Sequence, residues 1–160
     1  MSAYAIAASV TDPEMPMLTL EDLGVLREVR EVGTTVTVTL TPTYSGCPAL
    51  ATMRDDLVRR LGEAGYDARI EISLSPAWSS DDITERGHAA LREHGLSAPG
   101  PAPSHQGPIA LDLGPVRRDV DCPRCTSTRV ALTSEFGATA CKALYRCEAC
   151  LEPFEHVKEH

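Results

Sequence analysis

Residues 122–125 read Cys-Pro-Arg-Cys, and residues 147–150 read Cys-Glu-Ala-Cys. Each stretch is a C-x-x-C knuckle, and 21 residues separate the two inner cysteines. Two such knuckles bring four thiolates around one point, which is the tetrahedral arrangement of a structural zinc site. Because four sulfurs close the coordination shell, we expect this metal to hold a fold together and not to catalyse a reaction. The predicted ligands of the Zn²⁺ are Cys122, Cys125, Cys147 and Cys150.

The residues between the knuckles predict a small β domain. Val130, Leu132 and Phe136 fall on one face of a strand, and residues 143–146 form the return strand of a hairpin. We therefore expect a zinc ribbon over residues 119–160. This segment has about 42 residues, near the size below which a hydrophobic core alone rarely suffices. Zinc binding is then coupled to the folding of the ribbon.

Five residues near the knuckles raise alternatives. Thr126 and Leu151 follow the second cysteine of each knuckle, where iron-binding rubredoxin knuckles usually carry glycine, so zinc is favoured over iron. Cys141 lies outside the knuckle spacing. It is either a small packed residue at the hairpin tip, which we favour, or a partner contact or transient metal ligand. His156 and His160 could each replace a cysteine ligand, but four thiolates already fill the shell, and we expect both histidines in solvated positions.

Charge and length limit the classes of function. The 160 residues carry a net charge of −8, and residues 119–160 contain seven acidic and five basic side chains. Nucleic-acid binding needs a basic face, so we expect no nucleic-acid partner. No apolar run reaches the length of a membrane span, and residues 1–4 do not open a signal peptide. Together with cysteines in metal-ligand spacing, these features predict a cytoplasmic protein with no membrane partner.

Residues 1–95 predict a separate domain of helices around a small sheet. Threonine alternates with apolar residues over residues 35–40, and Gly33 joins this strand to the preceding one in a hairpin. Apolar residues at three- and four-residue spacing after Pro48 predict an amphipathic helix. In chain order we expect a helix over residues 2–10, strands over 23–32 and 35–40, a helix from Pro48 to Gly62, a strand over 68–74 and a helix over 82–94. The fold class is thus α+β: a small mixed sheet in the order α-β-β-α-β-α, followed by the zinc ribbon.

The same patterns predict the core faces and the connection between the domains. Three residues of the second strand should be buried: Val36, Val38 and Leu40. The apolar stripe of the following helix comprises Leu50, Met53, Leu57, Val58 and Leu61, and one face of the third strand comprises Ala68, Ile70, Ile72 and Leu74. Half of residues 97–108 are proline or glycine, so residues 96–118 are expected to be a linker. Alternating apolar residues near its end predict a short strand with Ile109, Leu111 and Leu113.

Cys47 stands directly before Pro48, at the predicted start of a helix. Unpaired backbone N–H groups and the positive end of the helix dipole stabilise a thiolate there. An accessible thiol of low pKa suits a nucleophile, a redox sensor, or a group that handles iron or an iron–sulfur cluster. The plain alternative is a small residue buried at the helix start. His88 and His94 lie late in the last predicted helix, and no phosphate loop or nucleophile elbow is present, so we do not expect an enzyme.

Several short motifs resemble a known family. The stretches Asp12-Pro13-Glu14, Leu23-Gly24-Val25-Leu26, Gly46-Cys47-Pro48 and Pro76-Ala77-Trp78 together resemble the SufT-like iron–sulfur assembly domain. Residues 136–147 read Phe-Gly-Ala-Thr-Ala-Cys-Lys-Ala-Leu-Tyr-Arg-Cys and lead into the second knuckle. With this ribbon, the chain from Asp12 to His156 resembles the PaaD family, the D proteins of the phenylacetate degradation pathway.

This resemblance implies a role beside the multicomponent phenylacetyl-CoA 1,2-epoxidase. That system has a di-iron oxygenase and a reductase that carries flavin and a [2Fe–2S] cluster. The resemblance implies an accessory protein that helps such a centre mature, with the other epoxidase components as partners, above all the [2Fe–2S] flavin reductase. It also implies that Cys47 handles iron or a transient iron–sulfur cluster, and that the four knuckle cysteines bind zinc.

Two hypotheses follow, of which the maturation factor is the leading one. The alternative is a non-catalytic structural subunit of the epoxidase. A zinc-dependent enzyme would need an open position on the metal, which four cysteine ligands do not leave. A homodimer is a further expectation, because a small sheet with an open edge can pair with a second copy.

Overall fold

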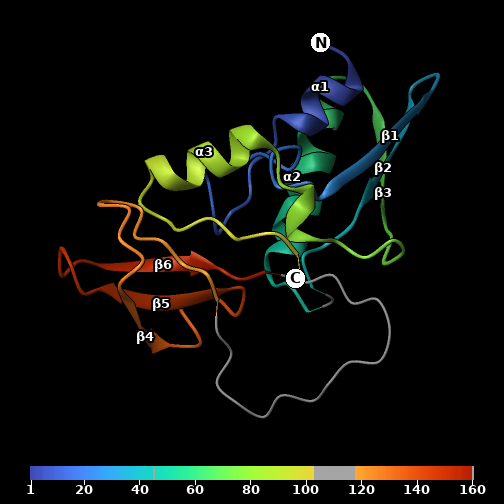
Figure 1. Cartoon of the computed structure of the whole chain (residues 1–160). Helices are drawn as coiled ribbons and strands as arrows, with labels where there is room; N and C mark the ends of the chain where they lie inside the picture. Colours follow the sequence, from blue (N-terminus) through green and yellow to red (C-terminus); the bar gives the residue numbers. More distant parts are fainter. Residues whose placement is uncertain (45, 103–117, 160) are drawn as a thin grey trace. The chain divides into compact units, whose positions relative to one another are not determined.

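The computed structural model describes residues 1–44, 46–102 and 118–159. The chain divides into two compact units, Met1–Leu91 and Arg92–His160, and each is described by itself (Figure 1). Helices and small sheets occur together, so the predicted α+β class is confirmed. The short strand predicted around Ile109, Leu111 and Leu113 lies outside the described residues. In the described ranges, no helix combines the length and the apolar character needed to cross a bilayer.

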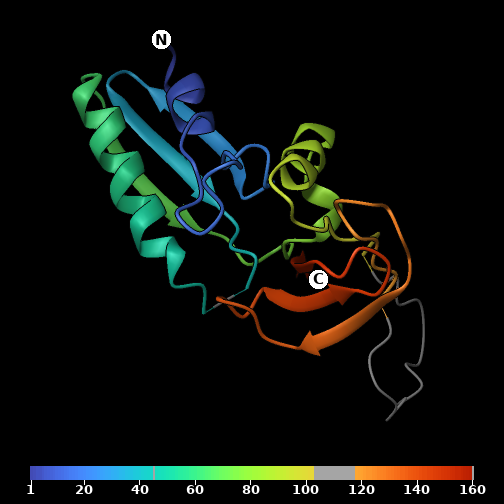
Figure 2. The same ribbon diagram turned by 90° about the vertical axis from the view of Figure 1, so that its left-hand side faces the viewer.

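The first unit follows the predicted order of helices and strands, with one short 3₁₀ helix added. Its elements are α1 (Ala3–Ala8), β1 (Leu26–Val32), β2 (Thr35–Leu40), α2 (Ala49–Glu63), β3 (Asp67–Ile72), η1 (Ser80–Asp82) and the greater part of α3 (Glu85–Glu93). The strands form one sheet in the order β1-β2-β3, in which β1 and β2 are antiparallel and β2 and β3 are parallel. Helix α2 packs against β3 and runs along the strands (Figure 2), while α1 contacts α2 and β1.

The core of this unit follows the predicted alternation on β2. Val36, Val38 and Leu40 are completely buried, and the threonines between them face the opposite side of the sheet. On α2 the buried stripe holds Met53, Leu57 and Leu61. Val58 and Leu74 depart from the expected faces. Val58 is 46% exposed because it lies beside the covered stripe, and Leu74 is 60% exposed because β3 ends two residues earlier.

The loop that precedes β1 docks on η1 through a close backbone approach. Gly24 has φ +71°, and a Cβ at this position would overlap the carbonyl oxygen of Asp82. The indole N–H of Trp78 donates a hydrogen bond of 2.8 Å to the carbonyl oxygen of Leu23. Only glycine fits such a left-handed, crowded position without strain. The Leu-Gly and Ala-Trp motifs of the sequence therefore meet in this unit as parts of its packing.

The second unit contains a three-stranded antiparallel sheet in the order β4-β5-β6. Its strands are β4 (Val130–Ser134), β5 (Lys142–Cys147) and β6 (Pro153–Val157). The hairpin predicted between the knuckles is present, and β6 is an additional strand. Leu132 and Phe136, expected on the inner face of the hairpin, are 43% and 66% exposed. The small core consists of Val120, Cys122, Ala143, Tyr145, Cys147 and Phe154.

His156 lies inside this unit, so the expectation of a solvated position is wrong. Its side chain on β6 is completely buried, and both ring nitrogens have a polar partner, of which Ser97 is distant in the sequence. Nδ1 lies 3.0 Å from Oγ of Ser97, and Nε2 lies 3.1 Å from Oε1 of Glu159. Ser97, which falls within the predicted linker, also donates its N–H to the carbonyl oxygen of Glu155 at 2.9 Å. The start of that segment therefore packs on β6.

Candidate metal and thiol sites

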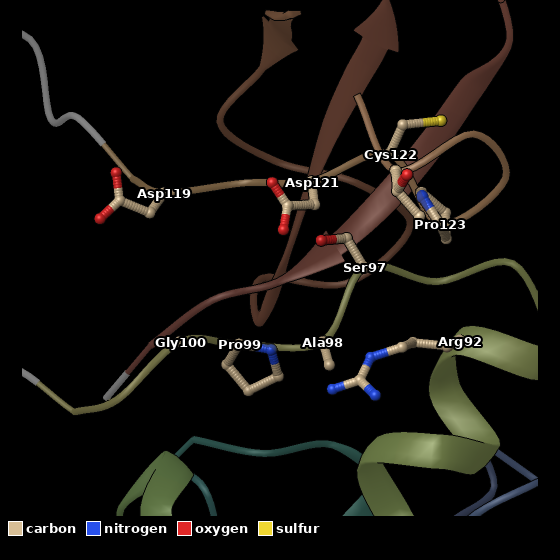
Figure 3. Close-up of a pocket in the computed structure, with 10 residues that line it drawn as sticks. Arg92, Ser97, Ala98, Pro99, Gly100, Asp119, Asp121, Cys122 and Pro123 are labelled. Atoms are coloured by element: carbon tan, nitrogen blue, oxygen red, sulfur yellow. The ribbon is translucent and has the colours of Figure 1, made fainter. Parts of the chain in front are cut away.

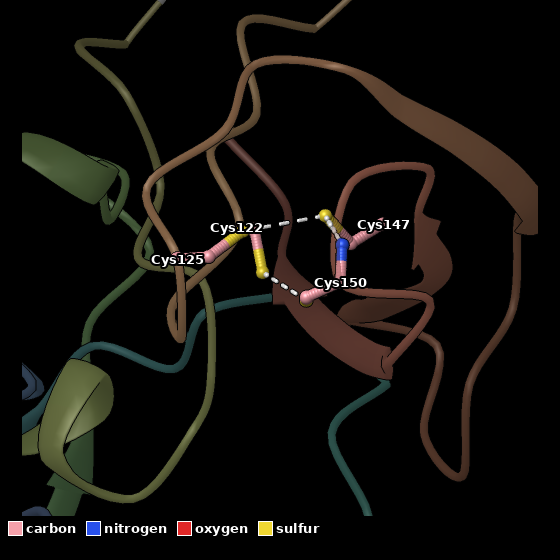
Figure 4. Close-up of side chains that lie close together, drawn as sticks. All are labelled: Cys122, Cys125, Cys147 and Cys150. Carbon is pink, nitrogen blue, oxygen red and sulfur yellow. Dashed lines mark hydrogen bonds between the residues drawn. The ribbon is translucent and has the colours of Figure 1, made fainter.

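The two knuckles bring the four predicted zinc ligands together in the second unit (Figure 4). All four Sγ atoms lie within 4.8 Å of one another. The Sγ atoms of Cys122 and Cys150 are 3.7 Å apart, and those of Cys125 and Cys147 are 3.5 Å apart. A tetrahedral zinc site with Zn–S bonds of about 2.3 Å requires sulfur–sulfur distances of about 3.8 Å. The four cysteines therefore fit a Zn²⁺ ion whose shell is closed by sulfur.

Backbone N–H groups prepare the second knuckle for a metal ion. The N–H groups of Cys150 and Ala149 point to Sγ of Cys147, at 3.5 and 3.4 Å. These donors, that of Cys150 above all, lower the pKa of Cys147 to about 6. A metal ligand must be a thiolate, so this sulfur is ready to bind at neutral pH.

Both knuckles contain a left-handed residue directly after their second cysteine. Thr126 has φ 59° and Leu151 has φ 66°. The absence of glycine at these positions favoured zinc over iron, yet the backbone adopts the conformation that glycine favours. A non-glycine residue there costs about 1–2 kcal/mol. This conformation could not be predicted from the sequence, because threonine and leucine carry no signal for it.

A pocket of about 440 Å³ lies beside the metal site (Figure 3). Cys122 lines it as well as belonging to the cysteine cluster, and Thr126 of the same knuckle lines it too. The side chains of Asp119 and Asp121 add two carboxylates to the wall. Arg92 adds a guanidinium to the same wall, so the pocket carries charges of both signs.

Cys47 lies in the first unit, directly before the helix it was predicted to precede. Helix α2 begins at Ala49, and its N-cap residue Pro48 provides no side-chain hydrogen bond. The N–H of Cys47 donates to the carbonyl oxygen of Tyr44 at 3.2 Å, and its own carbonyl accepts from Leu50 at 3.3 Å. The residue is partly exposed. In the part of the chain that the structure describes, Cys47 is not a member of a cluster of three or more metal-ligating side chains.

Cys141 is held at the end of the β4–β5 connection, one residue before β5. It is partly exposed, and its Sγ lies 3.1 Å from Oγ1 of Thr139. Its carbonyl oxygen accepts a hydrogen bond of 2.9 Å from the N–H of Lys158. These contacts agree with a packed residue at the hairpin tip, which was the favoured interpretation.

Two family models match separate parts of the chain. Residues 5–74 match the family model of an iron-sulfur cluster assembly protein, and residues 108–158 match that of the PaaD zinc beta ribbon domain. A protein of Escherichia coli (strain K12), described as the D component of a "Putative 1,2-phenylacetyl-CoA epoxidase", is 40% identical over 156 residues, which are 97% of this chain and 90% of that protein. The resemblance inferred from the motifs and the structural zinc site are both confirmed.

A solved structure shares its fold with about half of this chain. The crystal structure of a domain of unknown function, DUF59, from Bacillus anthracis has a TM-score of 0.52 and 24% sequence identity. The match covers 56% of this chain and 87% of the chain in that crystal structure. This likeness shows the fold alone.

Proposed function

The chain belongs to the family of the D components of 1,2-phenylacetyl-CoA epoxidases, and from this premise we propose that it is an accessory protein of such an epoxidase. In this role it helps an iron–sulfur or iron centre mature in another component and does not turn over substrate itself. The [2Fe–2S] flavin reductase is the foremost client. The observation that carries the proposal is a partly exposed Cys47 directly before a helix whose N-cap proline forms no side-chain hydrogen bond, within the segment that matches iron–sulfur assembly proteins.

Cys47 is the residue proposed to handle the cargo. Helix α2 has 15 residues, and no side chain of its N-cap residue satisfies the first N–H groups at its start. Amide hydrogens and the helix dipole favour an anion at such a position, which promotes the thiolate form that binds iron. The four knuckle cysteines lie together as a candidate metal site in the second unit, so the proposal assigns them to zinc and not to the cargo.

Transfer by Cys47 is a sequence of ligand exchanges on iron. The thiolate of Cys47 forms an Fe–S bond as one bond to the donor breaks. A cysteine of the client then displaces Cys47 in the same way. Each exchange forms one Fe–S bond and breaks another, so it needs no oxidant or reductant. Exchange of this kind requires an accessible sulfur, in agreement with the partial exposure of Cys47.

The zinc ribbon is proposed to dock on the client. Asp119 and Asp121 line the pocket beside the zinc site with Arg92, so two carboxylates stand against one guanidinium there. Such a surface favours a basic patch on the partner and speeds the encounter with it. Zinc keeps the ribbon folded and has no part in the exchange itself.

The test is the cluster content of the client. The reductase is co-expressed with the wild-type chain, with the Cys47→Ser variant, or with the matched Cys141→Ser variant. We expect the Cys47→Ser variant to keep its fold and its zinc but to yield reductase with several-fold less iron and sulfide. The measurements are elemental analysis and the visible absorbance of the cluster.

The Cys141→Ser variant should yield reductase with normal cluster content. Normal loading with the Cys47→Ser variant would rule out the proposed role of Cys47. Equal loss with both variants would show that any altered thiol disturbs the chain, and it would also count against a specific exchange at Cys47.

A non-catalytic structural subunit is the second candidate, because the E. coli relative is named as a subunit of its epoxidase. It predicts that the chain co-purifies with the oxygenase at a fixed ratio, whether or not the iron centres are loaded. A maturation factor is instead expected to associate with a client that lacks its cluster and to leave once the cluster is present. Size-exclusion chromatography of the co-expressed components separates the two outcomes.

A further inference from the structure

Strand β3 forms one edge of the sheet in the first unit. It pairs with β2 over six consecutive residues, Asp67 to Ile72, without a bulge. The other edge strand, β1, has an irregular register between Leu26 and Glu28. Such irregularities protect an edge from further pairing. Of the two edges, β3 is therefore the more regular template for another strand.

Alternation along β3 defines which backbone groups point away from the sheet. Asp67 donates its N–H to Thr34 at 2.8 Å, and Ser73 donates its N–H to Leu40 at 2.9 Å. Because backbone groups alternate in direction along a strand, the odd-numbered residues between them also bond to β2. The N–H and C=O groups of Ala68, Ile70 and Ile72 then point outward from the edge.

An antiparallel second copy of β3 fits these outward groups when Ile70 lies opposite Ile70 of the second copy. In this register Ala68 faces Ile72 of the second copy, and Ile72 faces its Ala68. All three are hydrogen-bonded pairs, which give six backbone bonds in total. A twofold axis through the Ile70 pair relates the copies, as expected for an isologous dimer.

The charges on β3 select the same register. Arg69 and Glu71 are exposed on the face opposite the core, and neither forms an ion pair within the part of the chain that the structure describes. With Ile70 on the axis, Arg69 lies opposite Glu71 of the second copy, and Glu71 lies opposite its Arg69. These are non-hydrogen-bonded pairs, in which side chains approach most closely. A shift by one pair in either direction places Arg69 opposite Arg69 or Glu71 opposite Glu71, and like charges repel.

The apolar face of β3 supports the pairing as well. Ile72 is 38% exposed although it shares a face with core residues of β2. Leu74, just beyond the strand, is 60% exposed. In the same register Ile72 packs against Ala68 of the second copy, and Leu74 comes toward its Tyr66. Apolar area at this end of the strand is then removed from water.

We infer that the chain forms a homodimer in which two β3 strands pair antiparallel around Ile70 and join the two sheets into one of six strands. The occupant is a second copy because the charge pattern of β3 complements itself in this register. Charges on an edge strand often prevent pairing, but here they attract. The interface contains neither Cys47 nor the zinc ligands, so it is independent of the proposed function.

Charge reversal tests the register with the full zinc-loaded chain. We expect multi-angle light scattering to give a mass about twice the 17.2 kDa of one chain for the wild type. Arg69→Glu places acidic groups opposite one another at two positions and should weaken dimerisation about 10- to 100-fold. Glu71→Arg places basic groups opposite one another at the same two positions and should weaken dimerisation to a similar extent. The matched control is Arg30→Glu, since Arg30 is exposed on β1 and changes the net charge equally.

Complementation makes the test specific. An equimolar mixture of the Arg69→Glu and Glu71→Arg variants restores both ion pairs and should form a heterodimer, although each variant alone is largely monomeric. The double variant should form a homodimer again. Circular dichroism and zinc content verify that every variant is folded.

Two results would overturn the inference. One is a wild-type chain that stays monomeric at 100 µM, about the concentration at which weak dimers form. The other is a dimer whose stability does not change with Arg69→Glu, or changes equally with Arg30→Glu. Failure of the mixture to form a heterodimer would reject the Ile70 register.

Discussion

Leu151 and Thr126 hold a backbone conformation that glycine adopts more readily. Each of these residues directly follows the second cysteine of a knuckle, where the chain turns back. The left-handed conformation is therefore part of the geometry of both knuckles. Leu151 is 61% exposed, so its side chain contributes little burial in return. The strain is offset by the backbone hydrogen bonds of the knuckles, such as that of 2.9 Å from the N–H of Cys147 to the carbonyl oxygen of Glu152.

Leu151→Gly is expected to stabilise the zinc-loaded ribbon by about 0–1.5 kcal/mol. Removal of left-handed strain gains about 1–2 kcal/mol, and the larger entropy of glycine in the unfolded chain costs about 0.5–1 kcal/mol. Thermal unfolding of the zinc-loaded chain measures the net change. The matched control is Glu152→Gly, because the neighbouring Glu152 has no positive φ and should lose stability. A loss of more than about 1 kcal/mol with Leu151→Gly would contradict the role given to strain.

The metal ligands could be predicted from the spacing of the cysteines, whereas the left-handed backbone conformation of the residues after them could not. The doubled C-x-x-C pattern names four residues because knuckle spacing sets which side chains converge. Pro48 similarly marked the helix start that places Cys47. The positive φ at Thr126 had no compositional signal, since threonine is among the residues least suited to it. Backbone hydrogen bonds close this turn, including one of 3.0 Å from the N–H of Cys122 to the carbonyl oxygen of Ser127, and a local sequence pattern does not record them.

Asp22 attaches α3 to the loop before β1. Its Oδ1 accepts a 2.7 Å hydrogen bond from Nε of Arg86 and one of 2.9 Å from Oγ1 of Thr84. Its Oδ2 accepts a third from Oγ1 of Thr19 at 2.8 Å. Burial by itself raises the pKa of Asp22, but these donors outweigh it and hold the pKa below the ordinary value of 3.8. The carboxylate is therefore more stable in the folded chain than in the unfolded one.

Asp22→Asn is expected to destabilise the first unit by about 1–3 kcal/mol at neutral pH, because the buried carboxylate accepts hydrogen bonds that the neutral amide satisfies only in part. Since the folded pKa is lowered, the stability from Asp22 is present above pH 3.8 and is lost as pH falls below it. The free energy of unfolding should thus fall less steeply below pH 4 in the variant than in the wild type. Urea unfolding followed by Trp78 fluorescence, at pH 7 and at several acidic pH values, measures both effects.

Glu21→Gln is the matched control, since Glu21 also contacts Arg86 but at 3.3 Å and from a more exposed position. It should change stability little at any pH. A parallel acid dependence in the Asp22→Asn variant and the wild type would show that Asp22 does not contribute through its charge.

Elements with a clean apolar alternation were predictable, and elements that bury polar groups were not. β2 carries three fully buried apolar residues at a period of two, so its face and extent followed from the sequence. On β6 the buried His156 interrupts the apolar pattern, and its partners are Ser97, which is distant in the sequence, and Glu159, three residues further along the chain. A histidine in a C-terminal stretch gives no sign that such partners exist. This long-range satisfaction of a buried polar group is why the third ribbon strand was missed.

At the scale of the whole molecule, the two units differ in what holds them together. The first unit has its own apolar core, with Leu57, Leu61, Val36 and Val38 fully or almost fully buried. The second has a core of six residues, two of which, Cys122 and Cys147, are also in the metal-binding cluster. Loss of zinc therefore removes core packing from the second unit and leaves the first core complete. The family matches divide the chain in the same way, before and after residues 75–107.

Removal of zinc by a strong chelator under reducing conditions is expected to unfold the ribbon and leave the first unit folded. Trp78 is the only tryptophan of the chain and lies buried in the first unit, so its fluorescence should stay unchanged. The helical circular dichroism should also persist, because α1, α2 and α3 all lie within residues 3–93. Limited proteolysis of the zinc-free chain should then degrade residues 119–160 and spare a fragment close to residues 1–95. Re-added zinc should restore protection, and a simultaneous loss of the Trp78 signal would show that the two units fold as one.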